Sequence, residues 1–203
     1  MTQAASIKAA NEVHSPKCSK CGATMRIISF VDKEHRLIER MISRIGDRLT
    51  SIESGGTVDP LFIDTAVDFI RVYADRTHHG KEEDILFRDL DKRALSDEDR
   101  RLMNELIEEH TFGRRTTQEL VAANDRYRNG EDAALRDIAE KLRFLTSFYP
   151  RHIEKEDKTF FPAARRYFTD EEDSAMLAEF YDFDKTMIHR KHTWVVEKLE
   201  SRA

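Results

Sequence analysis

The strongest constraint in this sequence is a run of apolar residues with helical spacing between residues 28 and 52. The intervals alternate between three and four, and the run consists of Ile28, Val31, His35, Ile38, Ile42, Ile45, Leu49 and Ile52. This spacing places all of these side chains on one face of an α-helix, so that face must be buried against partner elements. The polar member, His35, would then lie among aliphatic side chains.

Three further stretches repeat this pattern, and each also carries a histidine in its apolar line. The lines are Leu135, Ile138, Leu142, Leu145, Tyr149, His152, Glu156, Thr159 and Ala163; Met103, Leu106, His110, Gly113, Thr117 and Leu120; and, less regularly, Phe62, Phe69, Val72, Arg76, His79, Glu83, Leu86 and Leu90. Four amphipathic helices with short connections predict an all-α, up-down-up-down four-helix bundle. Each helix would present one histidine to a common core.

Glycine and proline are too scarce for the main β architectures. The 203 residues contain 7 glycines and 4 prolines, whereas β-sandwiches and barrels need frequent turn residues. No G-x-G-x-x-G or P-loop motif occurs, which excludes the usual nucleotide sites. The sequence predicts an N-terminal tail over residues 1–23, the bundle over 24–168 and an additional C-terminal helix over 169–203, packed on the outside of the bundle.

Charge and hydropathy exclude two classes of partner. The net charge of −5 is mixed along the chain, whereas a protein that binds a phosphate backbone carries a basic stripe. No apolar run approaches the roughly 18 residues of a membrane span, and the N-terminus lacks the apolar core of a signal peptide. We therefore expect a cytoplasmic protein that binds neither nucleic acid nor membrane, and a homo-oligomer is left open.

The two cysteines, Cys18 and Cys21, form a single C-x-x-C in the tail. With His14 they would supply three of the four ligands of a structural zinc site. The fourth would have to come from a neighbouring subunit, or from His189 or His192. A redox pair lacks its usual βαβ setting. A zinc site, a redox pair and an inert tail therefore all remain open.

The second and fourth helical stretches share the motif H-x-x-x-E-D-x-x-F, at residues 79–87 and again 73 residues later. A histidine and a glutamate four residues apart lie on one helix face, so each pair can bind one metal or two adjacent metals. His78 and Glu82 have the same spacing but do not belong to the repeated motif. The repeat therefore favours His79 and Glu83.

Buried histidines and glutamates in register point to bound metal. An unpaired buried carboxylate costs several kcal/mol, and imidazole and carboxylate ligands suit iron, zinc or manganese. The absence of thiolates in the predicted core argues against an iron–sulfur cluster. The E-x-x-H motif of the ferritin-like di-iron bundles does not account for this set. Two glutamates from facing helices would bridge two metals, with histidines at both ends.

These motifs resemble those of the hemerythrin-like family, the HHE cation-binding domains. The resemblance is carried by EHRLIERM (34–41), HHGKEEDILF (78–87), EHTFGR (109–114) and HIEKEDKTFFP (152–162). It covers roughly residues 25–200 and implies a four-helix bundle around a non-heme di-iron centre with carboxylate and oxo or hydroxo bridges. Carried over by position, the metal ligands would be His35, His79, Glu83, His110, His152 and Glu156.

One position departs from the oxygen-carrying members of that family. They have a second histidine one turn after the histidine of the third helix, and here that position is Arg114. Four histidines, two bridging glutamates and a bridging oxygen would leave about two of about twelve coordination positions open. More open positions favour reactivity over reversible carriage. Tyr149, one turn before His152, is left open as a ligand or a hydrogen-bonding group.

Three functions follow from this interpretation. The first is a di-iron protein that binds oxygen or a related small molecule for sensing, storage or detoxification. The second is a di-iron oxidoreductase that acts on peroxide or nitric oxide. The third is a bundle stabilised by zinc in the same six ligands. Manganese is a further alternative to iron.

Overall fold

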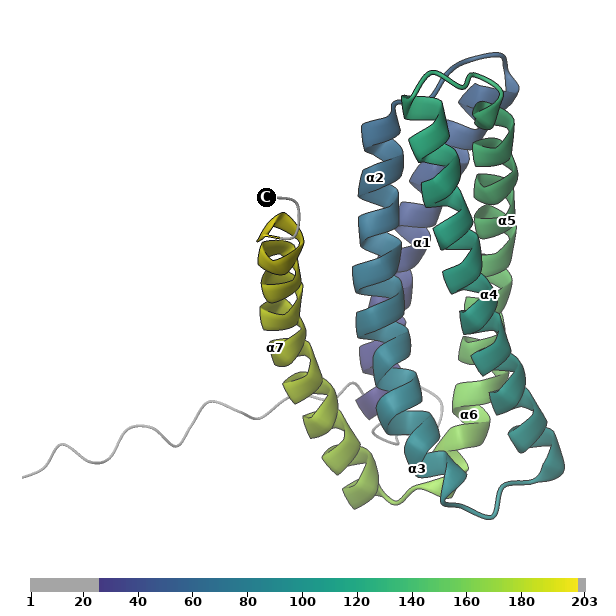
Figure 1. Cartoon of the computed structure of the whole chain (residues 1–203). Helices are drawn as coiled ribbons and strands as arrows, with labels where there is room; N and C mark the ends of the chain where they lie inside the picture. The colour runs from purple at the N-terminus through teal and green to yellow at the C-terminus, as the bar shows by residue number, and fades with distance from the viewer. Residues whose placement is uncertain (1–25, 201–203) are drawn as a thin grey trace, which may run out of the picture.

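The computed structural model describes residues 26–200, which form helices and connecting turns (Figure 1). The α-helices are α1 (Arg26–Glu53), α2 (Pro60–Phe69), α3 (Arg88–Asp91), α4 (Asp97–Arg128), α5 (Ala134–Lys155), α6 (Phe161–Ala164) and α7 (Asp170–Glu200). Between them lie the π-helical segments η1 (Ile70–His79), η2 (Glu82–Phe87) and η3 (Glu156–Phe160), and the 3-10 turn η4 (Arg165–Tyr167). The C-x-x-C motif and His14 lie outside the described residues.

The bundle consists of four long helical rods, whose arrangement can be followed in Figure 1. The first is α1, the second runs from α2 to α3, the third is α4, and the fourth runs from α5 to η4. Short connections join them, and consecutive rods run in opposite directions, which confirms the predicted all-α, up-down-up-down bundle. None of the described helices combines the length and the apolarity needed to cross a bilayer.

The rods begin and end at local sequence signals. Ser96 caps α4, because its Oγ accepts a hydrogen bond from the backbone N–H of Asp99 at 3.1 Å. At the start of α7, Thr169 Oγ1 accepts from the backbone N–H of Glu172, and the Glu172 carboxylate accepts from that of Thr169. This reciprocal pair is a capping box. Gly130 follows α4 with a φ of +91°, a left-handed conformation that glycine adopts without steric cost.

Two clusters of buried apolar side chains fill the bundle and leave a polar layer between them. Along α1, Val31 belongs to one cluster and Ile38 to the other, and His35 lies between them. His110 takes the equivalent place on α4. The apolar burial that holds the rods together therefore comes from both sides of the histidines.

The second rod follows its predicted line only in part: His79, Leu86 and Leu90 are buried as expected, whereas other positions are displaced. Its buried residues are Ile63, Ala66, Val67, Ile70, Ala74, His78, His79, Lys81, Glu82, Ile85, Leu86, Phe87 and Leu90. Arg76, which we predicted on the buried line, is exposed, and Glu83 is half-buried. The reason is the backbone of η1 and η2, in which hydrogen bonds run from i to i+5 and each turn takes an extra residue. An α-helical period therefore does not hold the register through this rod.

α7 lies outside the four rods, beside α1, η1 and η2 (Figure 1). Its side chains Met176 and Phe180 are buried with the cluster that contains Val31. The ring of Phe183 approaches the backbone of the second rod at Gly80, where an added Cβ would lie 2.9 Å from Phe183 Cζ. Glycine at this position lets α7 pack closely against the rod.

Candidate metal centre

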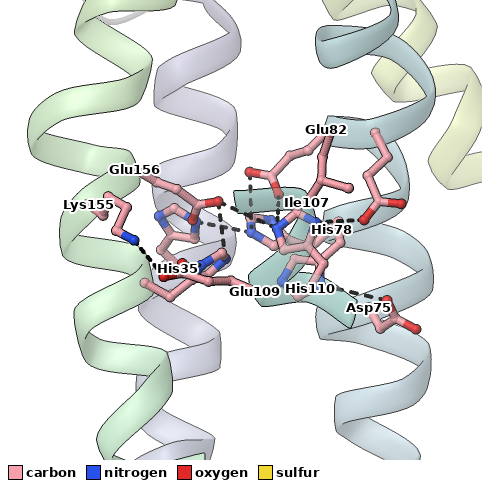
Figure 2. A network of polar contacts seen from close by, with 12 residues as sticks. His35, Asp75, His78, Glu82, Ile107, Glu109, His110, Lys155 and Glu156 are labelled. Atoms are coloured by element: carbon pink, nitrogen blue, oxygen red, sulfur yellow. Dashed lines mark hydrogen bonds and ion pairs between the residues drawn. The ribbon is translucent and has the colours of Figure 1, made fainter. Parts of the chain in front are cut away.

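Five histidines and two glutamates meet in the polar layer between the apolar clusters. They are His35 from α1, His78 and His79 from η1, Glu82 from η2, His110 from α4, His152 from α5 and Glu156 from η3. Figure 2 labels His35, His78, Glu82, His110 and Glu156 among them. None of these residues is more than 2% exposed. Every rod of the bundle therefore contributes at least one of them.

Their potential ligand atoms fall into two groups, within each of which the atoms lie no more than 4.8 Å apart. The first group holds His79, His110 and His152, and the second holds His35, His78, Glu82 and Glu156. The glutamates also approach the first group: Glu156 Oε1 lies 3.2 Å from His152 Nε2, and Glu82 Oε2 lies 3.6 Å from His110 Nε2. Both carboxylates thus stand between the two groups.

Most of the inward-facing polar atoms lack a hydrogen-bond partner in the described part of the chain. They are Nε2 of His110 and His152, both ring nitrogens of His79, and both carboxylate oxygens of Glu82 and Glu156. Glu156 lies 3.2 Å from both His35 Nε2 and His152 Nε2, but buried groups that make no hydrogen bond still cost several kcal/mol. Cations between them would remove that cost, and nitrogen and carboxylate donors suit iron, zinc or manganese. The donor set therefore fits a pair of metal ions.

Behind each of these histidines a carboxylate faces Nδ1. The Nδ1-to-oxygen distances are 2.8 Å for His35–Asp157, 3.0 Å for His78–Glu34, 3.6 Å for His79–Asp75, 2.6 Å for His110–Glu83 and 2.7 Å for His152–Glu109. At His35, His78, His110 and His152 this carboxylate accepts a hydrogen bond, which keeps the proton on Nδ1 and leaves Nε2 available to a metal. These four rings are therefore oriented before any metal binds. Asp75 is too far from His79 Nδ1 for a hydrogen bond.

Four of these contacts form a closed ring around the bundle. In each contact, an acid on one rod accepts a hydrogen bond from a histidine on the next rod. The acid on the fourth rod accepts from the histidine on the first, which closes the ring. The acids in this order are Glu34, Glu83, Glu109 and Asp157. Each acid is the sequence neighbour of an inward-facing residue. The fifth contact, His79 with Asp75, lies within one rod.

Cations in turn bind these carboxylates. Lys81 binds Glu34, Lys155 binds Glu109, Arg36 binds Asp157, and Arg114 binds both Asp75 and Glu83. Burial raises the pKa of Glu34, Glu83 and Glu109, but hydrogen bonds to the histidines and to these cations outweigh it. Each pKa lies below its usual value, so these acids remain ionised.

The structure brings together five of the six residues expected as ligands, namely His35, His79, His110, His152 and Glu156. Glu83 is not in either group: its Oε1 lies 2.6 Å from His110 Nδ1 and 2.6 Å from Arg114 Nη2. Glu82 takes its place, and His78 joins the centre. The signal for both was present in HHGKEE, which contains two overlapping H-x-x-x-E pairs.

A surface pocket reaches the centre from one side. Its volume is about 400 Å³, and its lining includes His79, His110, Arg114 and Tyr149. Tyr149 is 2% exposed, and burial raises the pKa of its hydroxyl, so that group stays protonated. A small molecule therefore has a route to the first group of histidines.

The metal-free protein is expected to lose stability as the pH rises from neutral. Burial opposes protonation of His35 and His152, but Asp157, Glu109 and Glu156 outweigh it and raise both pKa values from 6.5 to about 10. A histidine whose pKa is raised on folding stabilises the native state fully below the unfolded pKa. That contribution is lost as the pH rises through about 10.

Thermal unfolding of chelator-treated protein should therefore give a lower melting temperature at about pH 9.5 than at about pH 7. Asp157→Asn removes the negative charge beside His35 Nδ1, so it should reduce this pH dependence. A melting temperature that stays level or rises over the same interval would contradict the assignment.

Comparison with known proteins gives a match over most of the bundle. The family model of the hemerythrin HHE cation-binding domain matches residues 26–164, about two thirds of the chain. No curated protein and no solved structure matches it. The matched range contains all seven inward-facing residues and ends before α7. With histidine and glutamate groups able to hold metal, the chain is a cation-binding protein, and it belongs to the hemerythrin HHE cation-binding domain family.

Proposed function

We propose that this protein binds two iron ions between its four rods and uses them to bind dioxygen or a related small molecule. The observation that carries the proposal is the pair of ligand groups with two buried carboxylates between them. In the proposed centre His79, His110 and His152 would hold one ion, and His35 and His78 would hold the other. The carboxylates of Glu82 and Glu156 would supply oxygen donors to both.

The number of donors favours binding of a small molecule. Two six-coordinate ions offer about twelve positions. The five histidines, two bridging glutamates and a bridging oxygen would fill about eleven of them, so about one remains open. By this count the open position would belong to the ion held by His35 and His78. Such a centre suits dioxygen, peroxide or nitric oxide, and His78 makes it less open than the four-histidine set would be.

The residues of the chain itself keep the centre ready for this role. The carboxylate ring holds each Nδ1 proton in place, so that the rings need little reorganisation when metal binds. The apolar clusters cover the ligand atoms from above and below, and the pocket reaches them from one side. When bound, an iron pair would supply reversible electron exchange with an oxygen- or nitrogen-containing ligand.

Anaerobic loading with ferrous iron, followed by exposure to air, tests the proposal. We expect two iron ions per chain by elemental analysis and a visible charge-transfer band that appears with air and disappears when oxygen is removed. Irreversible turnover of peroxide would instead support an oxidoreductase. Colourless protein that carries stoichiometric zinc after native purification would exclude both and leave the zinc-stabilised bundle.

A further inference from the structure

One buried lysine connects the metal centre with the helix outside the bundle. The side chain of Lys81 is 0% exposed. Its Nζ lies 2.5 Å from Glu34 Oε1, 2.7 Å from Asp184 Oδ1 and 4.5 Å from the centre of the Phe30 ring. An ammonium removed from water needs such partners, because its burial is otherwise very costly. Lys81 therefore depends on acids from two different elements, α1 and α7.

Glu34 continues this connection to the centre. Its second oxygen, Oε2, accepts a hydrogen bond from Nδ1 of His78 at 3.0 Å. The Nε2 atom of the same ring lies 3.0 Å from Nε2 of His35, in the second ligand group. Four side chains in line thus join α7 to a ligand atom, in the order Asp184, Lys81, Glu34 and His78.

This connection differs from the other carboxylate contacts in two respects. The other cations behind the histidines, Arg36, Arg114 and Lys155, have side chains that are 49%, 38% and 24% exposed. Water can replace part of their role, whereas it cannot reach Lys81. Of the ion pairs that these four cations form within residues 26–200, only that of Lys81 with Asp184 reaches α7.

α7 also covers the lysine. Phe180 is 0% exposed, and its ring centre lies 5.9 Å from Lys81 Nζ. Phe183 packs against Gly80, the residue before the lysine. If α7 moved away, the ammonium would lose Asp184 and its aromatic cover and would become hydrated. Glu34 would then lose a fixed partner, and the orientation of His78 would loosen.

We propose that docking of α7 and metal binding at His78 are coupled through Asp184, Lys81 and Glu34, which act as positioning residues. The proposal rests on the metal centre proposed above. A cation on Nε2 makes the Nδ1–H of His78 a stronger donor to Glu34, which fixes the carboxylate that Lys81 needs. Coupling between two binding events is reciprocal. Metal therefore tightens the docking of α7, and a docked α7 strengthens binding at His78.

Cobalt(II) titration of the full-length chain tests the coupling, because cobalt reports its coordination by visible absorption. Asp184→Asn removes one charge at a half-buried position and preserves side-chain size. The wild-type chain should bind two cobalt ions. The variant should bind the first normally and the second about tenfold more weakly, within the usual range of coupling between sites. Cobalt should also slow amide hydrogen exchange across residues 180–187 in the wild type and not in the variant.

Lys191→Met is the matched control. Lys191 Nζ lies 2.9 Å from Asp68 Oδ2, so its loss removes an ion pair between α7 and α2 that touches no carboxylate bonded to a histidine. This variant should bind both cobalt ions as the wild type does. If the wild-type chain binds fewer than two, the proposed centre itself fails.

Two results would overturn the coupling alone. In the first, the wild-type chain binds two cobalt ions, and Asp184→Asn binds the second ion with the same affinity and shows the same amide hydrogen exchange in α7. The other is an equal loss of second-site affinity in Lys191→Met and in Asp184→Asn. An equal loss would mean that the contact of Asp184 with Lys81 has no specific effect on metal binding at the second site.

Discussion

Glu82→Gln is expected to abolish binding of the metal pair, whereas Glu83→Gln should keep both ions. The Glu82 carboxylate lies in the second group and within 3.6 Å of His110 Nε2 in the first, so the substitution removes negative charge between the two proposed ions. Glutamine at position 83 can still accept a hydrogen bond from His110 Nδ1. Loss of charge behind a ligand typically weakens metal affinity by about 10- to 100-fold without removing the site.

The same variants should have a different effect on the metal-free protein. Burial and the charge of Glu156 raise the pKa of Glu82, so its ionised form is unfavourable in the folded state. Glu82→Gln should therefore raise the melting temperature of the metal-free chain while it removes the stabilisation that metal adds. Elemental analysis and melting curves with and without ferrous iron check both effects. Two ions in Glu82→Gln together with none in Glu83→Gln would return Glu83 to the ligand set.

The sequence predicted the bundle well wherever the backbone is regular α-helix. In α1 the members of the predicted line from Val31 to Ile52 are buried as expected, because an apolar stripe with a period of 3.6 identifies the buried face directly. In the second rod the same reasoning was right for His79, Leu86 and Leu90 but wrong for Arg76 and Glu83. A π-helical turn has no comparable sequence period, so the inward direction of Glu82 depends on tertiary packing.

The internal repeat shows the same limit. By residue identity the motifs match at an offset of 73, which pairs Glu83 with Glu156. In the structure the equivalent residues are 74 apart: Glu82 corresponds to Glu156, and Glu83 corresponds to Asp157 as an acid bonded to the next rod's histidine. Sequence identity could not separate the two registers, because both place an acid at each position.

The carboxylate ring was not predictable for a related reason. Glu34 precedes His35 in the sequence, yet it bonds His78 on the neighbouring rod. Which helix an acid reaches depends on the order in which the rods surround the core. That order is a property of the packed bundle, whereas the spacing of residues along one chain identifies only faces.

His79→Ile should convert the centre into a nearly symmetric one that still binds two ions. At the offset of 74, His78 corresponds to His152, and His79 corresponds to Ile153, an apolar residue 3% exposed. His79 is therefore the one histidine of the proposed set without a counterpart. Both its ring nitrogens are buried without hydrogen-bond partners, so isoleucine should not destabilise the metal-free chain. Each ion would then be held by two histidines.

Loss of this histidine opens a second coordination position, on the side reached by the pocket that His79 lines. The variant should bind iron at about two ions per chain, with weaker affinity at the first group, and should give more similar spectra for the two ions. It should also react with peroxide faster and bind oxygen less reversibly than the wild type, because more open positions favour turnover. His189→Ala, an exposed histidine on α7, serves as the control and should change none of these properties. Wild-type iron affinity, spectra and oxygen reversibility in His79→Ile would remove His79 from the ligand set and leave the first ion with His110 and His152.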